Sequence, residues 1–231
     1  MSSVLITGTN RGIGLELVRQ YLSEGWQVYA TARDLLKATA LQQLATDNPD
    51  LLQIYSLDVT NHEQRLVLAE QLKNTPIDIL INNAGVYGQG DAFFGNTNVE
   101  QWLEALRINT IAPMKIMELF ANNIALGEKK IIASMSSKMG SMDDNGSGGS
   151  YVYRSTKAAL NAIMVSVAHD LKSSGITAVI LHPGWVRTDM GGPNGEINVQ
   201  QSAEHLRSIL ASVQIENSGS FYDIDGSIIP W

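Results

Sequence analysis

A tyrosine and a lysine four residues apart are the strongest sign of chemistry in the sequence. Of the seven tyrosines, only Tyr153 has a lysine at the fourth following position, Lys157. Residues at this spacing lie on one face of a helix, so the Lys157 ammonium can share a cavity with the Tyr153 phenol. A nearby positive charge favours the phenolate and lowers a phenol pKa that starts at about 10. We therefore expect Tyr153 to donate a proton to a carbonyl, or to accept one from an alcohol.

A serine cluster lies upstream of Tyr153, directly after an apolar run at 130–133 that is predicted to be a strand. A hydroxyl at the carboxyl end of a strand can hydrogen-bond a substrate oxygen and hold it against the tyrosine. Ser137 is the expected orienting residue and Ser136 is the alternative, while Ser134 is expected to be structural.

Asn109 is an unusual polar residue inside a predicted long helix, four residues before Pro113. Proline cannot donate the helical hydrogen bond to the Asn109 carbonyl, so a kink and a free backbone acceptor are expected there. A water held by that acceptor can relay protons to Lys157. An exposed helical asparagine beside a kink is the alternative.

The segment 7–14 reads Thr-Gly-Thr-Asn-Arg-Gly-Ile-Gly and follows an apolar run at 4–6. Glycines between a strand and a helix permit a tight turn and let the backbone approach a pyrophosphate, which the free N–H groups of the helix start can bind. A plain strand-to-helix turn is the alternative, but three glycines here favour a dinucleotide site. The expected contacts are Gly8, Asn10, Arg11, Gly12, Ile13 and Gly14.

The end of the second predicted strand distinguishes the two nicotinamide cofactors. NAD sites place an acidic residue there for the ribose 2′-hydroxyl, whereas NADP sites use arginine for the 2′-phosphate. The sequence has Arg33 at this place, and Arg11 lies in the glycine loop. We therefore expect NADP(H), with NAD(H) the less favoured cofactor. The alternative is that both arginines are solvated and that Asp34 neutralises Arg33.

Three further strand ends carry candidate cofactor contacts. Asp58 and Val59 follow the third strand, although Asp58 can instead cap the next helix. An Asn-Asn-Ala-Gly segment ends the fourth strand, and a structural turn is the alternative there. A Pro-Gly turn follows the sixth strand and can hold the nicotinamide carboxamide, or can be only a turn. The candidates in these segments are Asp58, Val59, Asn83, Ala84, Gly85, Pro183, Gly184, Val186 and Thr188.

Apolar, β-branched runs alternate with segments of helical period along the whole chain. Such runs with few polar residues predict a parallel sheet covered by helices on both faces, an α/β doubly wound fold in one domain, 1–231. The predicted strands are 4–6, 27–31, 52–57, 77–81, 130–133, 178–181 and one near 220–222. The predicted helices are 14–23, 35–45, 62–72, 100–124, 151–172 and 200–211.

Composition excludes several classes of protein. The chain has 231 residues and no cysteine, so it has no disulfide framework and no thiolate chemistry. A net charge of −7 argues against a nucleic-acid surface. No run of about eighteen apolar residues predicts a membrane span, and no export signal is evident, so a cytoplasmic location is expected. The four histidines lack metal-ligand spacing, so no metal site is expected.

Taken together, these motifs resemble the short-chain dehydrogenase/reductase family. The resemblance runs in order from Thr7 to about Thr188 and includes the 7–14 loop, Asn-Asn-Ala-Gly at 82–85, and Pro-Gly at 183–184. The segments 136–141, 144–149, 151–161, 182–192 and 225–231 are similar to the C-factor (C-signal) and sniffer-type carbonyl reductase branch of that family.

The resemblance implies a Rossmann-type fold with a seven-stranded, mostly parallel sheet and a catalytic tetrad. In that tetrad Tyr153 is the acid/base, and Lys157 lowers its pKa and binds the nicotinamide ribose. Ser137 orients the substrate and Asn109 holds a water. Tyr153 and Lys157 thus belong to the cofactor site as well. Dimers or tetramers through the two long helices at 100–124 and 151–172 are also implied.

Two functions fit these features. The first is an NADP(H)-dependent oxidoreductase that interconverts a small-molecule carbonyl compound and an alcohol by hydride transfer. The second is a C-factor-like signalling protein that binds the dinucleotide with little or no turnover. The intact Tyr153/Lys157 pair favours the enzyme. The segment 188–199 is expected to form a mobile lid, and Trp185 and Met190 indicate an apolar pocket wall.

Overall fold

The computed structural model describes residues 1–231 and contains one seven-stranded sheet. The strands run in the order β3-β2-β1-β4-β5-β6-β7, and every neighbouring pair is parallel. The doubly wound prediction is therefore confirmed. The strands are β1 Ser3–Ile6, β2 Gln27–Ala32, β3 Leu52–Ser56, β4 Ile79–Asn82, β5 Ile131–Met135, β6 Thr177–Leu181 and β7 Phe221–Tyr222.

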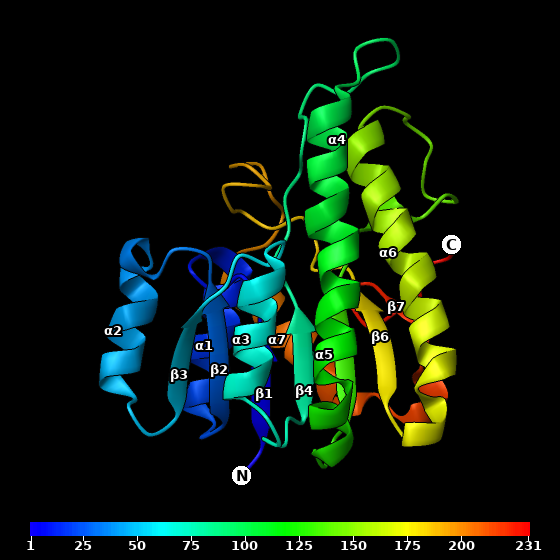
Figure 1. The fold of residues 1–231 in the computed structure, drawn as a ribbon. Helices are drawn as coiled ribbons and strands as arrows, with labels where there is room; N and C mark the ends of the chain where they lie inside the picture. The colour runs from blue at the N-terminus through cyan, green and yellow to red at the C-terminus, as the bar shows by residue number, and fades with distance from the viewer.

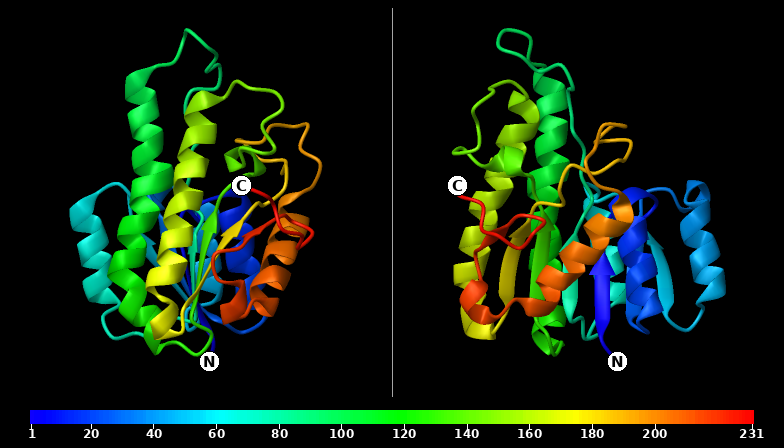
Figure 2. Two further views of the ribbon diagram at one scale, coloured as in Figure 1. Left: turned by 90° about the vertical axis from the view of Figure 1, so that its right-hand side faces the viewer. Right: turned by 180° about the vertical axis from the view of Figure 1, so that it is seen from behind.

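Helices cover both faces of the sheet (Figures 1 and 2). The first core packs α1, α2 and α7 on one face, and the second packs α3, α5 and α6 on the other. The helices are α1 Gly12–Ser23, α2 Thr39–Asp47, α3 His62–Gln71, α4 Val99–Leu106, α5 Ala112–Leu126, α6 Tyr151–Asp170 and α7 Val199–Ser212. None of them is long and apolar enough to cross a membrane.

Alternate residues of each strand enter opposite cores, as the pleat of a strand requires. In β1, Val4 and Ile6 pack with one helix layer while Leu5 packs with the other, and all three are fully buried. In β4, Ile79 and Ile81 share the first core and Leu80 lies in the second. Burial of each such side chain stabilises the fold by about 1.5–3 kcal/mol. This two-sided burial explains why the strands read as continuous apolar runs.

Two predicted helices are interrupted. The predicted helix 100–124 contains a π-helical turn at Arg107–Ile111, between α4 and α5. Proline at position 113 cannot donate a backbone hydrogen bond, and the wider turn closes through the Ala112 N–H, which donates to the Arg107 carbonyl oxygen. The predicted helix 35–45 begins as a separate 3₁₀ turn, in which the Asp34 carboxylate accepts a hydrogen bond from the Leu36 N–H.

The carboxyl ends of β1, β4, β5 and β6 lie side by side at one edge of the sheet. Chain connections leave β1 and β4 in opposite directions, so a crevice opens between these two strands. The long helices α4–α5 and α6 extend beyond this edge, and the segments 141–150 and 186–198 lie over it (Figure 2). This arrangement brings the loops that carry the predicted site residues together.

Candidate active site

The glycine loop after β1 is shaped by close backbone contacts. Gly8 has φ +70°, and a Cβ added there would lie 2.8 Å from the Cα of Ala84. A Cβ on Gly14 would lie 2.4 Å from the Gly8 carbonyl oxygen. Neither position can hold a larger residue without moving the backbone. The helix α1 begins at Gly12, and no side chain caps its first N–H groups, which leaves donors for an anionic group.

Asn83 ties the glycine loop to β4. Its side-chain amide donates to the Thr7 and Gly8 carbonyl oxygens at 2.8 and 2.9 Å, and its backbone N–H donates to the Thr7 hydroxyl at 3.0 Å. The Thr7 hydroxyl also accepts the Ala84 N–H at 3.0 Å. Asn83 therefore has the structural role that was the alternative to cofactor contact. It also borders the cavity described in the next paragraph.

A cavity of about 780 Å³ runs along this edge of the sheet. It joins the glycine loop, the end of β2, the end of β4 and the start of α6, which are far apart in the sequence. Such a volume suits a dinucleotide together with part of a substrate. The predicted residues that line it are Gly8, Asn10, Arg11, Gly12, Ile13, Gly14, Arg33, Asp58, Val59, Asn83, Ala84, Gly85, Tyr153, Lys157, Pro183 and Thr188.

Two predicted cofactor contacts, Gly184 and Val186, are not in the cavity wall. A Cβ on Gly184 would lie 2.8 Å from the Ile197 side chain, and Val186 forms a β-bridge with Ile197. Both residues therefore pack against Ile197 and support the segment 188–199, and neither faces the cavity. Within that segment, the Thr188 hydroxyl accepts the Gly191 N–H at 3.0 Å.

Positive charge gathers at the β2 end of the cavity. The Arg33 guanidinium is exposed and forms no ion pair. Asp34 lies beside it but binds the Leu36 N–H and pairs with Lys37 at 3.4 Å, so it does not neutralise Arg33. Lys37 is a further basic residue of the cavity wall and was not predicted from the sequence. Its position in the sequence, four residues after Arg33 and at the start of a predicted helix, could have indicated a second basic residue near the 2′-phosphate.

Arg11 reaches across the mouth of the cavity. Its guanidinium forms an ion pair with Asp189 at 2.5 Å, which joins the glycine loop to the segment 188–199. Both side chains are about 70% exposed, so the pair is worth at most about 1 kcal/mol and can exchange for an anion.

Asp58 does not cap a helix. Its carboxylate accepts the Thr60 N–H and hydroxyl at 2.9 and 2.7 Å, while Asn61 caps α3 by accepting the Gln64 N–H. Asp58 instead stabilises the turn that places Val59 at the cavity wall.

Tyr153 and Lys157 lie at the inner end of the cavity, on the first turns of α6. Both side chains are buried, and the Lys157 ammonium lies 5.6 Å from the centre of the Tyr153 ring. The ammonium donates to the Met135 carbonyl oxygen at the end of β5, at 2.8 Å. The structure thus brings the predicted pair together in one enclosed place.

The pKa of Tyr153 shifts in the direction opposite to the one expected. Burial of the phenol raises its pKa to about 12, the Ser137 hydroxyl acts against this rise, and the neighbouring Tyr87 adds to it. Burial also lowers the pKa of Lys157 to about 8. At a pH near 12, where Tyr153 would ionise, Lys157 has already lost its proton. No positive charge is then present to stabilise the buried phenolate. Around neutral pH the phenol holds its proton and the lysine is charged.

The three candidate serines occupy different surroundings. Ser136 donates to the Asn161 side-chain oxygen at 2.6 Å, and Ser134 accepts from the Asn82 amide at 3.3 Å. Ser137 caps the 3₁₀ turn Lys138–Gly140, where its oxygen accepts the Met139 N–H at 3.2 Å, and it lies against the Tyr153 phenol. Ser137 is thus the serine whose hydroxyl meets the tyrosine, although Ser136, unlike Ser137, also lines the cavity.

Asn109 is buried in the π turn, not exposed. Its side-chain amide donates to the Val86 carbonyl oxygen at 2.8 Å and to the Thr156 hydroxyl at 3.0 Å, and its oxygen accepts the Val86 N–H at 2.9 Å. The side chain therefore fixes the segment after β4 to α6. A water relay at this residue would have to use the backbone carbonyl.

Tyr87 is a further site residue that was not predicted from the sequence. Its ring stacks on the Tyr153 ring with centres 4.6 Å apart and planes 17° from parallel. Its hydroxyl bonds the Ser150 hydroxyl at 3.0 Å, immediately before α6. The two tyrosines are far apart in the sequence, and no local spacing indicates that they stack.

Comparisons with known proteins agree with this geometry. The family model for short chain dehydrogenases matches residues 2–198. The C-signal of Myxococcus xanthus is 37% identical over 156 residues, which span 68% of this chain and 93% of that protein. The structure of the carbonyl reductase Sniffer of D. melanogaster covers 100% of both chains with a TM-score of 0.94 at 30% identity.

A further solved structure, the NADPH-bound carbonyl reductase from chicken fatty liver, has a TM-score of 0.90 at 33% identity. It covers 100% of this chain and 99% of its own. The resemblance to the C-signal and sniffer branch is confirmed. The chain belongs to the short-chain dehydrogenase/reductase family of oxidoreductases.

Proposed function

We propose that this protein is an NADP(H)-dependent carbonyl reductase in which Tyr153 is the proton donor. The observation that carries the proposal is the buried pair of Tyr153 and Lys157 at the inner end of the cavity that begins at the glycine loop. A cofactor stretched from that loop would bring its nicotinamide toward the phenol. When bound, NADPH supplies the hydride, and the residues of the chain supply orientation and the proton.

The cofactor would be held by groups that the cavity presents. The free N–H groups at the start of α1 suit a pyrophosphate, and the exposed Arg33 with Lys37 suits a ribose 2′-phosphate. Arg11 can exchange its surface partner Asp189 for phosphate. Several of the similar solved structures hold NADP or NADPH, which supports this assignment.

The proton-transfer groups favour carbonyl reduction. The Tyr153 phenol is protonated around neutral pH because burial raises its pKa to about 12, so it can donate to a carbonyl oxygen. Alcohol oxidation would require the phenolate as a base, which burial disfavours. As the proton leaves, the Lys157 ammonium stabilises the developing negative charge on the phenol oxygen. Ser137 orients the substrate oxygen, and the Asn109 carbonyl holds a water near Lys157.

The segment 188–199 is proposed to act as the lid over this site. Its base is fastened by the Val186–Ile197 bridge, and the Arg187 guanidinium donates to the Gly195 carbonyl oxygen at 2.9 Å. Between these points, the Arg11–Asp189 ion pair is the contact that joins the lid to the glycine loop. Met190 is about half exposed and lines the cavity, which suits an apolar substrate, whereas Trp185 lies outside the cavity wall and its indole N–H donates to the Gly191 carbonyl oxygen at 2.8 Å.

Oxidation of NADPH by a panel of aldehydes, ketones and quinones tests the proposed function, with NADH in parallel. We expect turnover with at least one carbonyl class and a preference for NADPH. Binding of NADPH without turnover on any compound would contradict the proposal.

Arg33→Ala is expected to raise the Kd for NADPH by about 10- to 100-fold and to leave the Kd for NADH unchanged. A charge-assisted hydrogen bond to a phosphate contributes about 1.5–3 kcal/mol, and about 1.4 kcal/mol corresponds to a tenfold change in affinity. Arg19→Ala is the control, because Arg19 is a partly exposed arginine of α1 outside the cavity. Fluorescence titration measures both constants, and an equal loss of affinity for the two cofactors would refute the role of Arg33.

Tyr87→Leu is expected to lower kcat by up to about tenfold, because stacked aromatic rings contribute about 0.5–1.5 kcal/mol and hold each other in place. Tyr87→Phe keeps the ring and loses only the bond to Ser150, so its kcat should stay within about twofold of the wild type. Steady-state kinetics of both variants provide the measurement. Equal rates in the two variants would show that the stack does not position Tyr153.

A homo-oligomer built on α4–α5 and α6 is proposed as the assembled form. Leu103, Ile111 and Leu126 are about half exposed along α4–α5, which leaves apolar surface for a second copy. Light scattering after size exclusion should give a dimer or tetramer mass, and Ile111→Arg should lower it. A monomeric wild type at micromolar concentration would contradict the proposed assembly.

The C-signal similarity favours a second candidate, a dinucleotide-binding signalling protein with little turnover. This candidate predicts a biological effect that survives Tyr153→Phe. The reductase predicts that the effect and the turnover are lost together in that variant.

A further inference from the structure

The C-terminal segment 221–231 folds back as a hairpin beside the active site. Tyr222 and Ile228 form an antiparallel bridge, and the Ile229 N–H donates to the Phe221 carbonyl oxygen at 2.8 Å. The Trp231 ring stacks on the Phe221 ring with centres 5.9 Å apart. Because Phe221 is fully buried in the core, the hairpin has a fixed place at the end of the sheet.

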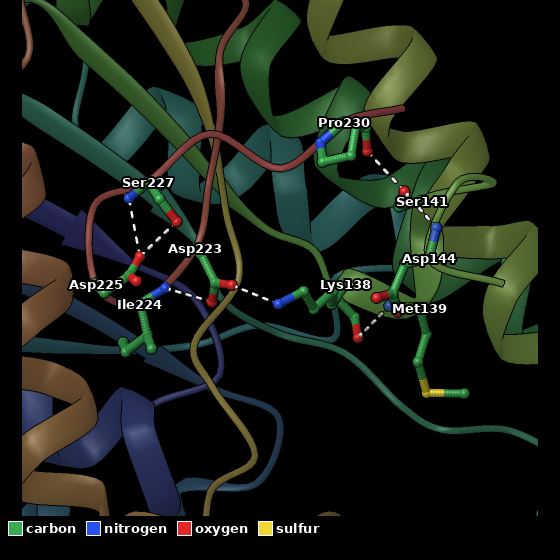
Figure 3. Close-up of polar contacts among 10 residues, drawn as sticks. Lys138, Met139, Ser141, Asp144, Asp223, Ile224, Asp225, Ser227 and Pro230 are labelled. Atoms are coloured by element: carbon green, nitrogen blue, oxygen red, sulfur yellow. Dashed lines mark hydrogen bonds and ion pairs between the residues drawn. The ribbon is translucent and has the colours of Figure 1, made fainter. Parts of the chain in front are cut away.

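One ion pair connects this hairpin to the residue that follows Ser137. The Lys138 ammonium lies 2.7 Å from the Asp223 carboxylate (Figure 3). The Asp223 side chain is 15% exposed, and its other oxygen accepts the Ile224 N–H at 2.7 Å. The hydrogen bond to Lys138 acts against desolvation and leaves the pKa of Asp223 below its usual value. The carboxylate is therefore oriented by two hydrogen bonds and largely shielded, while the Lys138 side chain is 45% exposed.

A second contact lies at the end of the same hairpin. The Ser141 hydroxyl donates to the Pro230 carbonyl oxygen at 2.6 Å (Figure 3). The N–H groups of Met142 and Asp143 donate to the Trp231 main-chain oxygen at 2.7 and 2.9 Å. The segment 138–143 is thus attached to the hairpin at both of its ends.

The opposite side of the segment is pressed against the helix that carries the proton donor. A Cβ on Gly140 would lie 2.9 Å from the Lys157 Cβ, and the Asn161 amide donates to the Gly140 carbonyl oxygen at 3.4 Å. Ser137 begins this turn, and its hydroxyl oxygen has one hydrogen bond from the backbone, the Met139 N–H of the same turn. The direction of the Ser137 hydroxyl therefore depends on where the turn is held.

We propose that Lys138 and Asp223 are positioning residues: their ion pair holds the turn that begins at Ser137 so that the serine hydroxyl faces the Tyr153 phenol. This inference rests on the proposed reductase function. It gives the C-terminal hairpin a role in orienting the substrate carbonyl, without contact between the hairpin and the substrate.

The test compares Lys138→Met and Asp223→Asn with the wild type. We expect kcat to fall by about 10- to 100-fold, because a displacement of about 1 Å at a reacting centre costs up to about 100-fold in rate. The Kd for NADPH should stay within about twofold, since neither residue lines the cofactor cavity. Lys73→Met is the matched control, because it breaks an exposed ion pair of 3.2 Å with Glu70, just beyond the C-terminal end of α3, and should not change kcat.

Rescue separates positioning from a general loss of stability. Lys138→Arg should recover most of kcat, and the exchanged pair Lys138→Asp with Asp223→Lys should exceed either single charge reversal. The double variant Lys138→Met with Asp223→Asn should be no slower than either single variant, because both remove one interaction. Hydrogen exchange of the peptide 136–143 should rise in Lys138→Met and not in Lys73→Met.

Any of three results would overturn the inference. The first is a kcat of Lys138→Met within about twofold of the wild type, and the second is a loss of NADPH affinity in that variant as large as its loss of kcat. The third is a double variant in which the effects of the two single substitutions add. These results are distinct from a failure of the proposed function. An inactive wild type would overturn both proposals, whereas an active wild type with an equally active Lys138→Met would overturn the positioning role alone.

Discussion

Tyr153→Phe is expected to lower kcat for carbonyl reduction by about 10²- to 10⁴-fold, the range that general acid catalysis supplies. The substitution removes one oxygen atom from a buried ring and keeps the stack on Tyr87. The cavity wall therefore keeps its shape, and the Kd for NADPH should stay within about twofold. Steady-state rates and fluorescence titration measure the two quantities separately.

Tyr151→Phe provides the control for this substitution. Tyr151 lies on the same first turn of α6, is 37% exposed and does not line the cavity. Its loss of a hydroxyl should leave kcat unchanged. A rate for Tyr153→Phe equal to that of Tyr151→Phe would mean that the phenol donates no proton in the slow step.

The rate of reduction is also expected to fall as the pH rises through about 8. Burial lowers the pKa of Lys157 to about 8, so the ammonium loses its proton in this range, while Tyr153 remains protonated because its pKa is about 12. The charge that stabilises the developing phenolate is then absent. We expect kcat/KM to decrease on the alkaline side, with the acidic side flat through neutral pH.

Lys157→Met should remove this pH step and lower kcat/KM by about 10²- to 10³-fold, the cost of removing one preorganised electrostatic group. Methionine has a similar length and can occupy the buried space, so the fold should persist. Profiles of kcat/KM against pH for both proteins provide the measurement. A variant that retains the alkaline decrease would assign the step to another group.

The fold and the pairing of Tyr153 with Lys157 could be predicted because both depend on local periodicity. Apolar runs become strands buried on both faces, and a spacing of four residues on a helix places two side chains together. The direction of the Tyr153 pKa shift could not be predicted, because it depends on burial by segments distant in the chain. The same limit applies to Tyr87, whose stacking partner lies on another element.

Other differences arise where packing against a distant segment decides what a residue contacts. Pro113 correctly indicated an irregular helix, but the irregularity is a π turn that turns Asn109 inward to bind Val86. Gly184 and Val186 lie in the predicted motif but pack against Ile197 below the lid segment. In both cases the sequence motif identified the right segment, and tertiary packing decided which atoms face the cavity.

The role of Tyr153 as the proton donor is tested most directly by rapid mixing of the NADPH-bound enzyme with an aldehyde at about neutral pH. We expect a single phase of NADPH oxidation in the wild type that is slowed at least about 100-fold in Tyr153→Phe, with equal NADPH occupancy in both proteins. Oxidation of NADPH at the same rate in the two proteins would contradict the assignment of Tyr153 as the proton donor.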